Sequence, residues 1–180
     1  LFDHPCFPVK YNQLGAEIVF HKLEPRKPFV LNNLSLTPYQ LDHPNPCWGV
    51  KIESDGKVYS HCVDTEATRV SQNELGEDLP LYQGVDMMFF DAQYTIMETV
   101  DKMDWGHSSA ATGLDIAMRE GIKRIVFGHH DPASPDVKIE QVEIEASRYY
   151  KTQLKSAKRS GVKVHEVEWT FAVEGQVIEI

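Results

Sequence analysis

Residues 124–132, RIVFGHHDP, combine a short apolar run with consecutive titratable side chains. The first four residues are typical of a buried strand, and His129, His130 and Asp131 follow it almost at once. Sites in α/β proteins lie where strands end at one edge of the sheet, because the loops there bring their side chains together. The stretch therefore favours an α/β fold with a functional site at a sheet edge.

Other predicted strands end in a similar way. Residues 57–63 run into Asp64, residues 85–90 (VDMMFF) run into Asp91, and His43 lies in a proline-rich loop between strands. Imidazole nitrogen and carboxylate oxygen without thiolate suit zinc, manganese or iron in a hydrolytic site. Each residue also has a purely structural explanation. The aspartates are common turn or helix-capping residues, and the histidine can hydrogen-bond within its loop.

The rest of the pattern is rich in strands before residue 85 and alternates between strands and helices after it. The predicted strands are residues 16–23, 29–36, 48–53, 57–63, 85–90, 124–127, 162–167 and 169–180, with an Asp55-Gly56 hairpin turn after the third. The predicted helices are residues 109–120 and 135–159, and residues 71–80 form a predicted surface loop. We expect one unit, residues 1–180, with helices over a sheet.

The composition restricts the classes of partner. The 180 residues include 27 acidic and 18 basic side chains, for a formal net charge of −9. A generic nucleic-acid or anionic-membrane binder needs clustered positive charge, so both are disfavoured, although a bound metal can still attract a phosphate ester. No apolar run approaches the ~18 residues of a membrane span. The three cysteines share no CxxC spacing, which favours a reducing cytoplasm over a disulfide scaffold.

The helix predicted at residues 109–120 begins after Gly106-His107-Ser108-Ser109. Either serine is explained by an N-cap role alone. The start of a helix also favours anions, and a histidine beside it can donate a proton. Both explanations stay open on these residues alone.

Taken in order, the motifs resemble the C-terminal half of a metallo-β-lactamase-fold hydrolase. The branch is the phosphodiesterase-like one, related to ribonuclease Z and to bacterial cyclic-nucleotide phosphodiesterase-like proteins. The motifs are residues 4–9 (HPCFPV), the loop around His43, and residues 58–66, 91–94 (DAQY), 106–109 and 129–132. The resemblance implies an α/β fold of the αβ/βα four-layer sandwich family, with this chain as a mixed β-sheet carrying helices on one face.

The resemblance also implies two divalent metal ions about 3.5–4 Å apart that share a carboxylate and a hydroxide. Zinc is the first expectation, with manganese or iron as alternatives. By motif, the metal ligands are His43, Asp64 (the bridge) and His129, the general acid is His107, the phosphate-binding residues are Ser108 and Ser109, and Asp91, His130 and Asp131 orient the ligands or close the pocket.

The principal motif of the family, His-x-His-x-Asp-His, does not occur in the sequence. Three ligands do not close the coordination of two metals. Because the sequence begins without Met in what resembles a mid-domain segment, we expect the N-terminal half to be missing and the isolated chain to be inactive. Half a sandwich exposes a sheet face and edge, so we expect pairing with that half or with a second copy.

The predicted activity is that of a metal-dependent phosphodiesterase in which the bridging hydroxide attacks phosphorus and His107 protonates the leaving oxygen. The sequence has no basic arm, which favours a small phosphodiester over tRNA. Two alternatives are a noncatalytic signalling or interaction module that keeps the fold, and a thioester or lactone hydrolase of the same fold.

Overall fold

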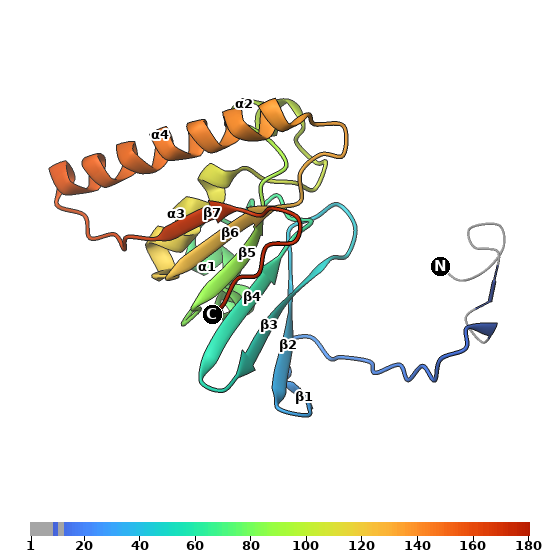
Figure 1. The fold of residues 1–180 in the computed structure, drawn as a ribbon. Helices are drawn as coiled ribbons and strands as arrows, with labels where there is room; N and C mark the ends of the chain where they lie inside the picture. The colour runs from blue at the N-terminus through green and yellow to red at the C-terminus, as the bar shows by residue number, and fades with distance from the viewer. Residues whose placement is uncertain (1–8, 11–12) are drawn as a thin grey trace.

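The computed structural model describes residues 9–10 and 13–180, so most of the motif at residues 4–9 lies outside the described part. Seven strands form one sheet in the order β1-β2-β3-β4-β5-β6-β7 (Figure 1). The strands are β1 (Phe29–Leu31), β2 (Leu34–Gln40), β3 (Trp48–Ser54), β4 (Lys57–Cys62), β5 (Met87–Asp91), β6 (Arg124–Gly128) and β7 (Glu168–Phe171). The helices are α1 (Gln72–Leu75), η2 (Gly76–Leu81), α2 (Ile96–Asp101), α3 (Ala110–Glu120) and α4 (Asp136–Ser160).

The sheet is mixed, as predicted. Strands β1 to β4 pair antiparallel, whereas β4 to β7 pair parallel. Parallel neighbours need a crossover, which α3 makes between β5 and β6 and α4 makes between β6 and β7. The expected adjacency of β5 and β6 is confirmed, with Phe90 paired to Phe127. The carboxyl ends of β4, β5 and β6 therefore meet at one edge.

The helices cover one face of this sheet (Figure 1). Leu114 of α3 and Val142 of α4 share a buried cluster with Phe90 and Phe127, and side chains of α1 and η2 join it. Gly113 brings α3 close to the sheet, because a Cβ there would lie 2.7 Å from the Phe90 ring and 2.8 Å from the Phe127 ring. The prediction of helices on one face is confirmed.

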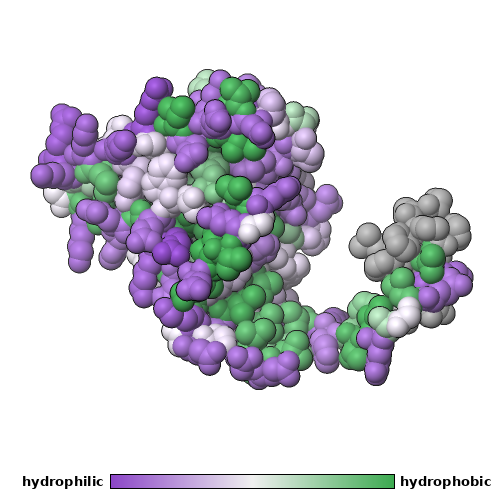
Figure 2. All heavy atoms as spheres, viewed as in Figure 1, coloured by the Kyte–Doolittle hydropathy of each residue, from purple (hydrophilic) through white to green (hydrophobic). Residues whose placement is uncertain are grey.

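The opposite face, which we call the open face, is apolar. In register across the strands, Ile52 pairs with Leu36 and Tyr59, and His61 pairs with Phe89. His61 and Phe89 point away from the helices because their neighbours along the strands are buried (Ser60, Cys62, Met88 and Phe90). The register places Tyr59, Ile52 and Leu36 on the same face. Figure 2 shows hydrophobic side chains gathered over the end of the sheet where β2, β3 and β4 lie. The segment after β7 runs across the part of the open face that β6 forms, where Arg124 donates a hydrogen bond to the Glu179 carbonyl oxygen (Figure 1).

The two long helices follow the prediction closely. Ser109 is the N-cap of α3 and accepts a hydrogen bond from the Thr112 N–H, and Gly121 ends the helix with φ of 74°. Gly161 ends α4 with φ of 70°. Glycine adopts this left-handed conformation without the penalty that a Cβ brings. No helix of the described residues is long and apolar enough to cross a bilayer.

Several predicted boundaries are wrong. Residues 16–23 form no strand and run exposed along the arm that leaves the sheet in Figure 1. The predicted strand at residues 29–36 is two strands, because Asn32 takes a φ of 56° and reverses the chain between β1 and β2. Residues 162–167 form no strand, and the predicted strand at residues 169–180 shrinks to β7. Apolar alternation alone therefore did not suffice for a strand at these positions.

Residues 71–80 are also not the predicted loop but carry α1 and most of η2. Ser71 and Glu74 form a reciprocal capping box that starts α1. Asp78 is buried in this segment and accepts hydrogen bonds from Arg26 and Arg69, at 2.8 and 2.9 Å for the shortest contacts. This ion-pair network fastens the segment to the start of the sheet.

Candidate metal centre

Four metal-ligand side chains from separate parts of the sequence meet at the carboxyl edge of the parallel strands. Asp64 follows β4, Asp91 ends β5, His129 follows β6, and His107 precedes α3. One ligand-type atom from each of the four lies within 4.8 Å of the others. The strand-end rule predicted that side chains from these strand ends meet at one edge, and the structure places Asp64, Asp91 and His129 together there.

The distances show which side chains face one another. His129 Nε2 lies 2.8 Å from Asp64 Oδ1. His107 Nδ1 lies 3.9 Å from the same oxygen and 2.9 Å from Asp91 Oδ2. The His107 and His129 rings are 5.1 Å apart between centroids. Two imidazoles and the Asp64 carboxylate thus point into one small volume.

The backbone at the two strand ends is unusual. Asp64 has φ of 57° and His129 has φ of 63°. Such left-handed conformations cost free energy in residues other than glycine, and they persist where the surrounding structure enforces them, often at functional sites. The same sharp turn after β4 and after β6 directs both side chains toward the shared volume.

Asp91 is fully buried and acts as a hydrogen-bond acceptor for three loops. Its Oδ2 accepts from the backbone N–H groups of Asp64 and Thr65 and from His107 Nδ1. Its Oδ1 accepts from the N–H groups of Gln93 and Ser108. These five donors occupy both oxygens, so Asp91 positions the site and leaves His107 Nε2 free, in keeping with the orienting role expected for it.

We expect Asp91→Ala to lower the free energy of unfolding by about 3–5 kcal/mol, because several buried donors lose their acceptor together. Urea denaturation of the variant and the wild type measures this difference. Asp86→Ala is the control. Asp86 accepts hydrogen bonds from the Val58 N–H and from Lys123 at the other end of the strands. Each of these two hydrogen bonds contributes only ~1 kcal/mol, because water can replace it. An Asp91→Ala protein as stable as the Asp86→Ala protein would contradict this role.

His43 lies beside the group of four without belonging to it. Its ring is 6.2 Å from the His107 ring, and its Nδ1 contacts the Asn45 carbonyl oxygen at 3.0 Å, which leaves Nε2 free. Gly106 packs against this ring so closely that a Cβ there would overlap it. Gly106 N–H in turn donates to Glu66 Oε1 at 3.1 Å. The role of His43 as a metal ligand stays a prediction, with a free nitrogen on the correct side of the molecule.

The donor set fits a divalent transition metal. Asp64 and His129 are partly exposed, with 44% and 33% of their side chains accessible, and they supply one carboxylate and one imidazole. Burial raises the pKa of the nearby Cys47 thiol, and Asp64 adds to the effect, so no thiolate competes in the set. Oxygen and nitrogen donors of this kind suit zinc, manganese or iron. Even with His43 they are too few to enclose two metals.

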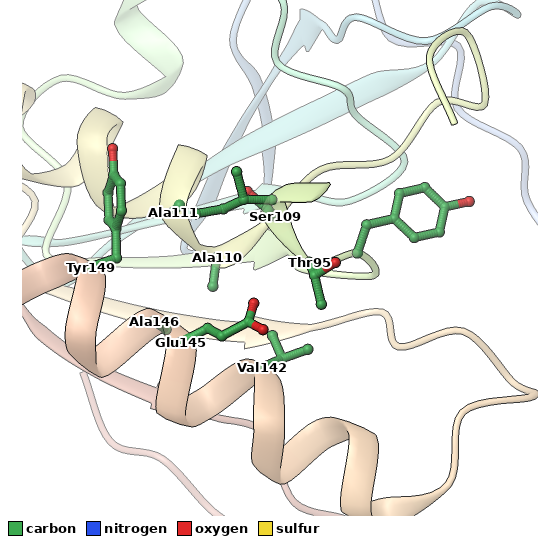
Figure 3. A pocket seen from close by; sticks show the side chains of 10 residues that line it. Thr95, Ser109, Ala110, Ala111, Val142, Glu145, Ala146 and Tyr149 are labelled. Atoms are coloured by element: carbon green, nitrogen blue, oxygen red, sulfur yellow. The ribbon is translucent and has the colours of Figure 1, made fainter. Parts of the chain in front are cut away.

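Ser108 and Ser109, expected to bind phosphate, use their hydroxyls within the protein. Ser108 Oγ donates to the Glu66 carbonyl oxygen at 3.4 Å, and Ser109 Oγ caps α3. Figure 3 shows Ser109 at a narrow pocket that faces Val142 and Glu145 of α4. This pocket is lined by none of the four clustered residues, and its carboxylate disfavours an anion. Contact of either serine with substrate stays a prediction.

The two residues after His129 take different positions. The His130 ring stacks on Phe171 of β7, with centroids 5.7 Å apart. Asp131 Oδ1 accepts from the Ala133 N–H, and its Oδ2 lies 4.0 Å from Lys102 Nζ. Burial lowers the pKa of His130, and His129 acts in the same direction. Both effects favour the neutral form of His130, whose ring packs against the sheet beside the site.

Two contributors had no assigned role in the sequence. Glu66 fixes Gly106 and thereby the loop that carries His107. Tyr94 is 2% exposed, and its ring meets the His107 ring edge-on at 5.7 Å. Both lie within motifs that were recognised, but their importance rests on contacts between segments about 13 to 40 residues apart.

No family model matches the chain. Among curated proteins, the ribonuclease Z of Porphyromonas gingivalis is 29% identical over 79 residues, which is 44% of this chain and 24% of that protein. The ribonuclease Z of Azobacteroides pseudotrichonymphae is 30% identical over 86 residues, which is 48% of this chain and 27% of that protein. The matches thus span about a quarter of the length of these relatives.

Solved structures show the fold. The metallo-β-lactamase fold protein YhfI from Bacillus subtilis superposes with a TM-score of 0.61 at 15% identity, covering 83% of this chain and 51% of that one. Zinc-bound PqqB from Methylobacterium extorquens gives 0.57 at 16% identity, covering 88% and 55%. The short form of human tRNase Z gives 0.54 at 16% identity, covering 84% and 45%. The chain therefore has the metallo-β-lactamase fold over about half the length of these proteins, with sequence similarity to its ribonuclease Z branch.

Proposed function

We propose that the chain forms the C-terminal half of a metal-dependent hydrolase that cleaves a small phosphodiester. The observation that carries this proposal is the meeting of Asp64, His107 and His129 at one sheet edge, with Asp91 behind them. The similarity to ribonuclease Z supports a phosphorus–oxygen bond as the target. The acidic net charge of −9 supports a small substrate over a nucleic-acid polymer.

Each residue has a distinct task in this proposal. Asp64 and His129 bind metal, together with His43 and with ligands from the N-terminal half. The metal ions that these residues would hold would supply polarisation of the phosphoryl oxygens and a water molecule of lowered pKa. His107, held through Nδ1 by Asp91, presents Nε2 to the leaving oxygen and gives it a proton. Asp91 keeps the ring in that orientation.

The direct test is hydrolysis by the complete, metal-loaded protein. We expect it to cleave a phosphodiester such as bis(p-nitrophenyl) phosphate, to lose activity with a chelator, and to regain it with zinc or manganese. The isolated chain should be inactive because its ligand set is incomplete. Cleavage of thioesters or lactones alone would favour another hydrolase of this fold, and failure to bind metal would favour the noncatalytic module.

We further propose that the open face is covered by the N-terminal half or, in its absence, by a second copy. The partly exposed row through Leu36, Ile52 and Tyr59 supports this, since sheet faces of this kind pack against another layer. Cys47 and Cys62 are free thiols, which agrees with the cytoplasmic location that we propose.

We expect Ile52→Lys, on the open face, to weaken binding of the N-terminal half or of a second copy by about 10- to 100-fold. The change removes an aliphatic side chain that the complex would bury and introduces a charge in its place. Sedimentation velocity over a concentration series measures the association. Ile144→Lys is the matched control, because Ile144 is 50% exposed on α4. A chain that stays monomeric throughout the series, and binds no separately expressed N-terminal half, would contradict the proposal.

A further inference from the structure

Trp105 is a large aromatic side chain exposed beside the metal centre. It is 63% exposed and stands two residues before His107. An indole is costly to leave in water and is the side chain best suited to stacking on a planar group. An exposed indole at this place is therefore available to stack on a planar ligand.

The backbone that carries Trp105 is held on both sides. The Trp105 N–H donates to the Lys102 carbonyl oxygen at 3.2 Å, which closes a turn at the end of α2. The next residue, Gly106, has φ of 89°, donates to Glu66 and packs against the His43 ring. The indole is thus displayed from a fixed position, which lowers the entropy lost when a ligand binds.

A chain of contacts connects the indole to the proposed acid. Lys102 Nζ lies 5.7 Å from the Trp105 ring centroid and 4.2 Å from the Tyr94 ring centroid. Tyr94 in turn meets the His107 ring edge-on. The ammonium group lies between the two rings, and Asp131 Oδ2 at 4.0 Å offsets part of its charge.

We propose that Trp105 binds the heterocyclic base of a nucleoside leaving group by stacking. The inference rests on the proposed function, in which His107 faces the departing oxygen. Trp105 stands two residues before His107 and is connected to it through Lys102 and Tyr94. In the reaction, the oxygen of water bonds to phosphorus and the bond from phosphorus to the nucleoside oxygen breaks. His107 gives its proton to that oxygen and recovers one from the attacking water. The products are a nucleoside and a phosphomonoester.

The kinetic test compares two substrates in the complete, metal-loaded protein. One is a dinucleoside monophosphate with adenosine as leaving group, and the other is the methyl ester of the same nucleotide. Trp105→Ala should lower the ratio of their kcat/KM values by about 5- to 150-fold, the worth of one stacked base. Trp105→Phe should give an intermediate ratio. Met97→Ala, which removes an equally exposed side chain from α2, should leave the ratio unchanged.

A binding measurement keeps this inference separate from the proposed function. Adenosine added to the complete protein should quench indole fluorescence, and Trp105→Phe should abolish the response. If neither substrate is hydrolysed but adenosine still quenches, the proposed function fails and the base site stands. If hydrolysis occurs with an unchanged ratio and no quenching, the base site fails and the function stands. An indole shielded from acrylamide in the complete protein would show that protein covers Trp105, and would overturn the inference.

Discussion

Replacing Asp64 by alanine is expected to remove bound metal from the complete protein. Asp64 is the carboxylate that lies between the two imidazoles, with His129 Nε2 at 2.8 Å and His107 Nδ1 at 3.9 Å from its Oδ1. If it bridges two ions, its loss affects both. Metal affinity should fall by more than the ~10- to 100-fold that removal of an outer hydrogen-bonding partner costs. Metal content after dialysis, measured by atomic emission, gives the result.

Because Asp64 has a positive φ, the alanine variant needs a second variant that tolerates this backbone conformation. Alanine tolerates this backbone conformation less well than asparagine, so Asp64→Asn separates the loss of charge from local strain. Asp55→Asn is the control, since Asp55 has φ of 50° in the hairpin turn between β3 and β4. Full metal content in both Asp64 variants would show that Asp64 is not a ligand.

Replacing His107 by alanine is expected to lower kcat by ~10²- to 10⁴-fold while metal content is retained, because a general acid contributes about that much. Its Nδ1 faces the buried Asp91 carboxylate at 2.9 Å, so Nε2 is the atom available for proton transfer.

His21→Ala is the matched control for this experiment. His21 is exposed and contacts the Phe29 ring at 5.1 Å, outside the group of clustered ligands, so its loss should leave kcat unchanged. Loss of metal in His107→Ala, with metal retained in Asp64→Ala, would invert the two roles. Retention of full activity in His107→Ala would assign the proton transfer to another group.

Local pattern was sufficient for the elements with strong internal signals. The apolar runs at residues 85–90 and 124–127 became β5 and β6, and the Asp55-Gly56 turn joined β3 to β4. The helices α3 and α4 ended at Gly121 and Gly161 as predicted. In each case neighbouring residues decide the outcome, through side-chain period, turn geometry or capping.

Local pattern failed where pairing or packing decided. Residues 16–23 have the composition of a strand, but they join no strand of the sheet and are mostly exposed. Residues 71–80 look like a polar loop, but Asp78 turns inward to Arg26 and Arg69 and holds the segment against the sheet. The contact between Arg26 and Asp78 joins residues that are 52 positions apart in the sequence.

The candidate site also depends partly on local sequence and partly on tertiary contacts. The sequence alone predicted which candidate residues lie at the site, because Asp64, Asp91 and His129 each follow or end a recognisable strand and His107 precedes a recognisable helix. Only the tertiary structure decided their arrangement. The parallel pairing of β4, β5 and β6 sets Asp64 beside His129, and the buried Asp91 carboxylate collects donors from three loops. The left-handed backbone at Asp64 and His129 is likewise enforced from outside, since neither residue type requires it. Strand register and shared acceptors arise from contacts across the sheet, which no stretch of sequence contains by itself.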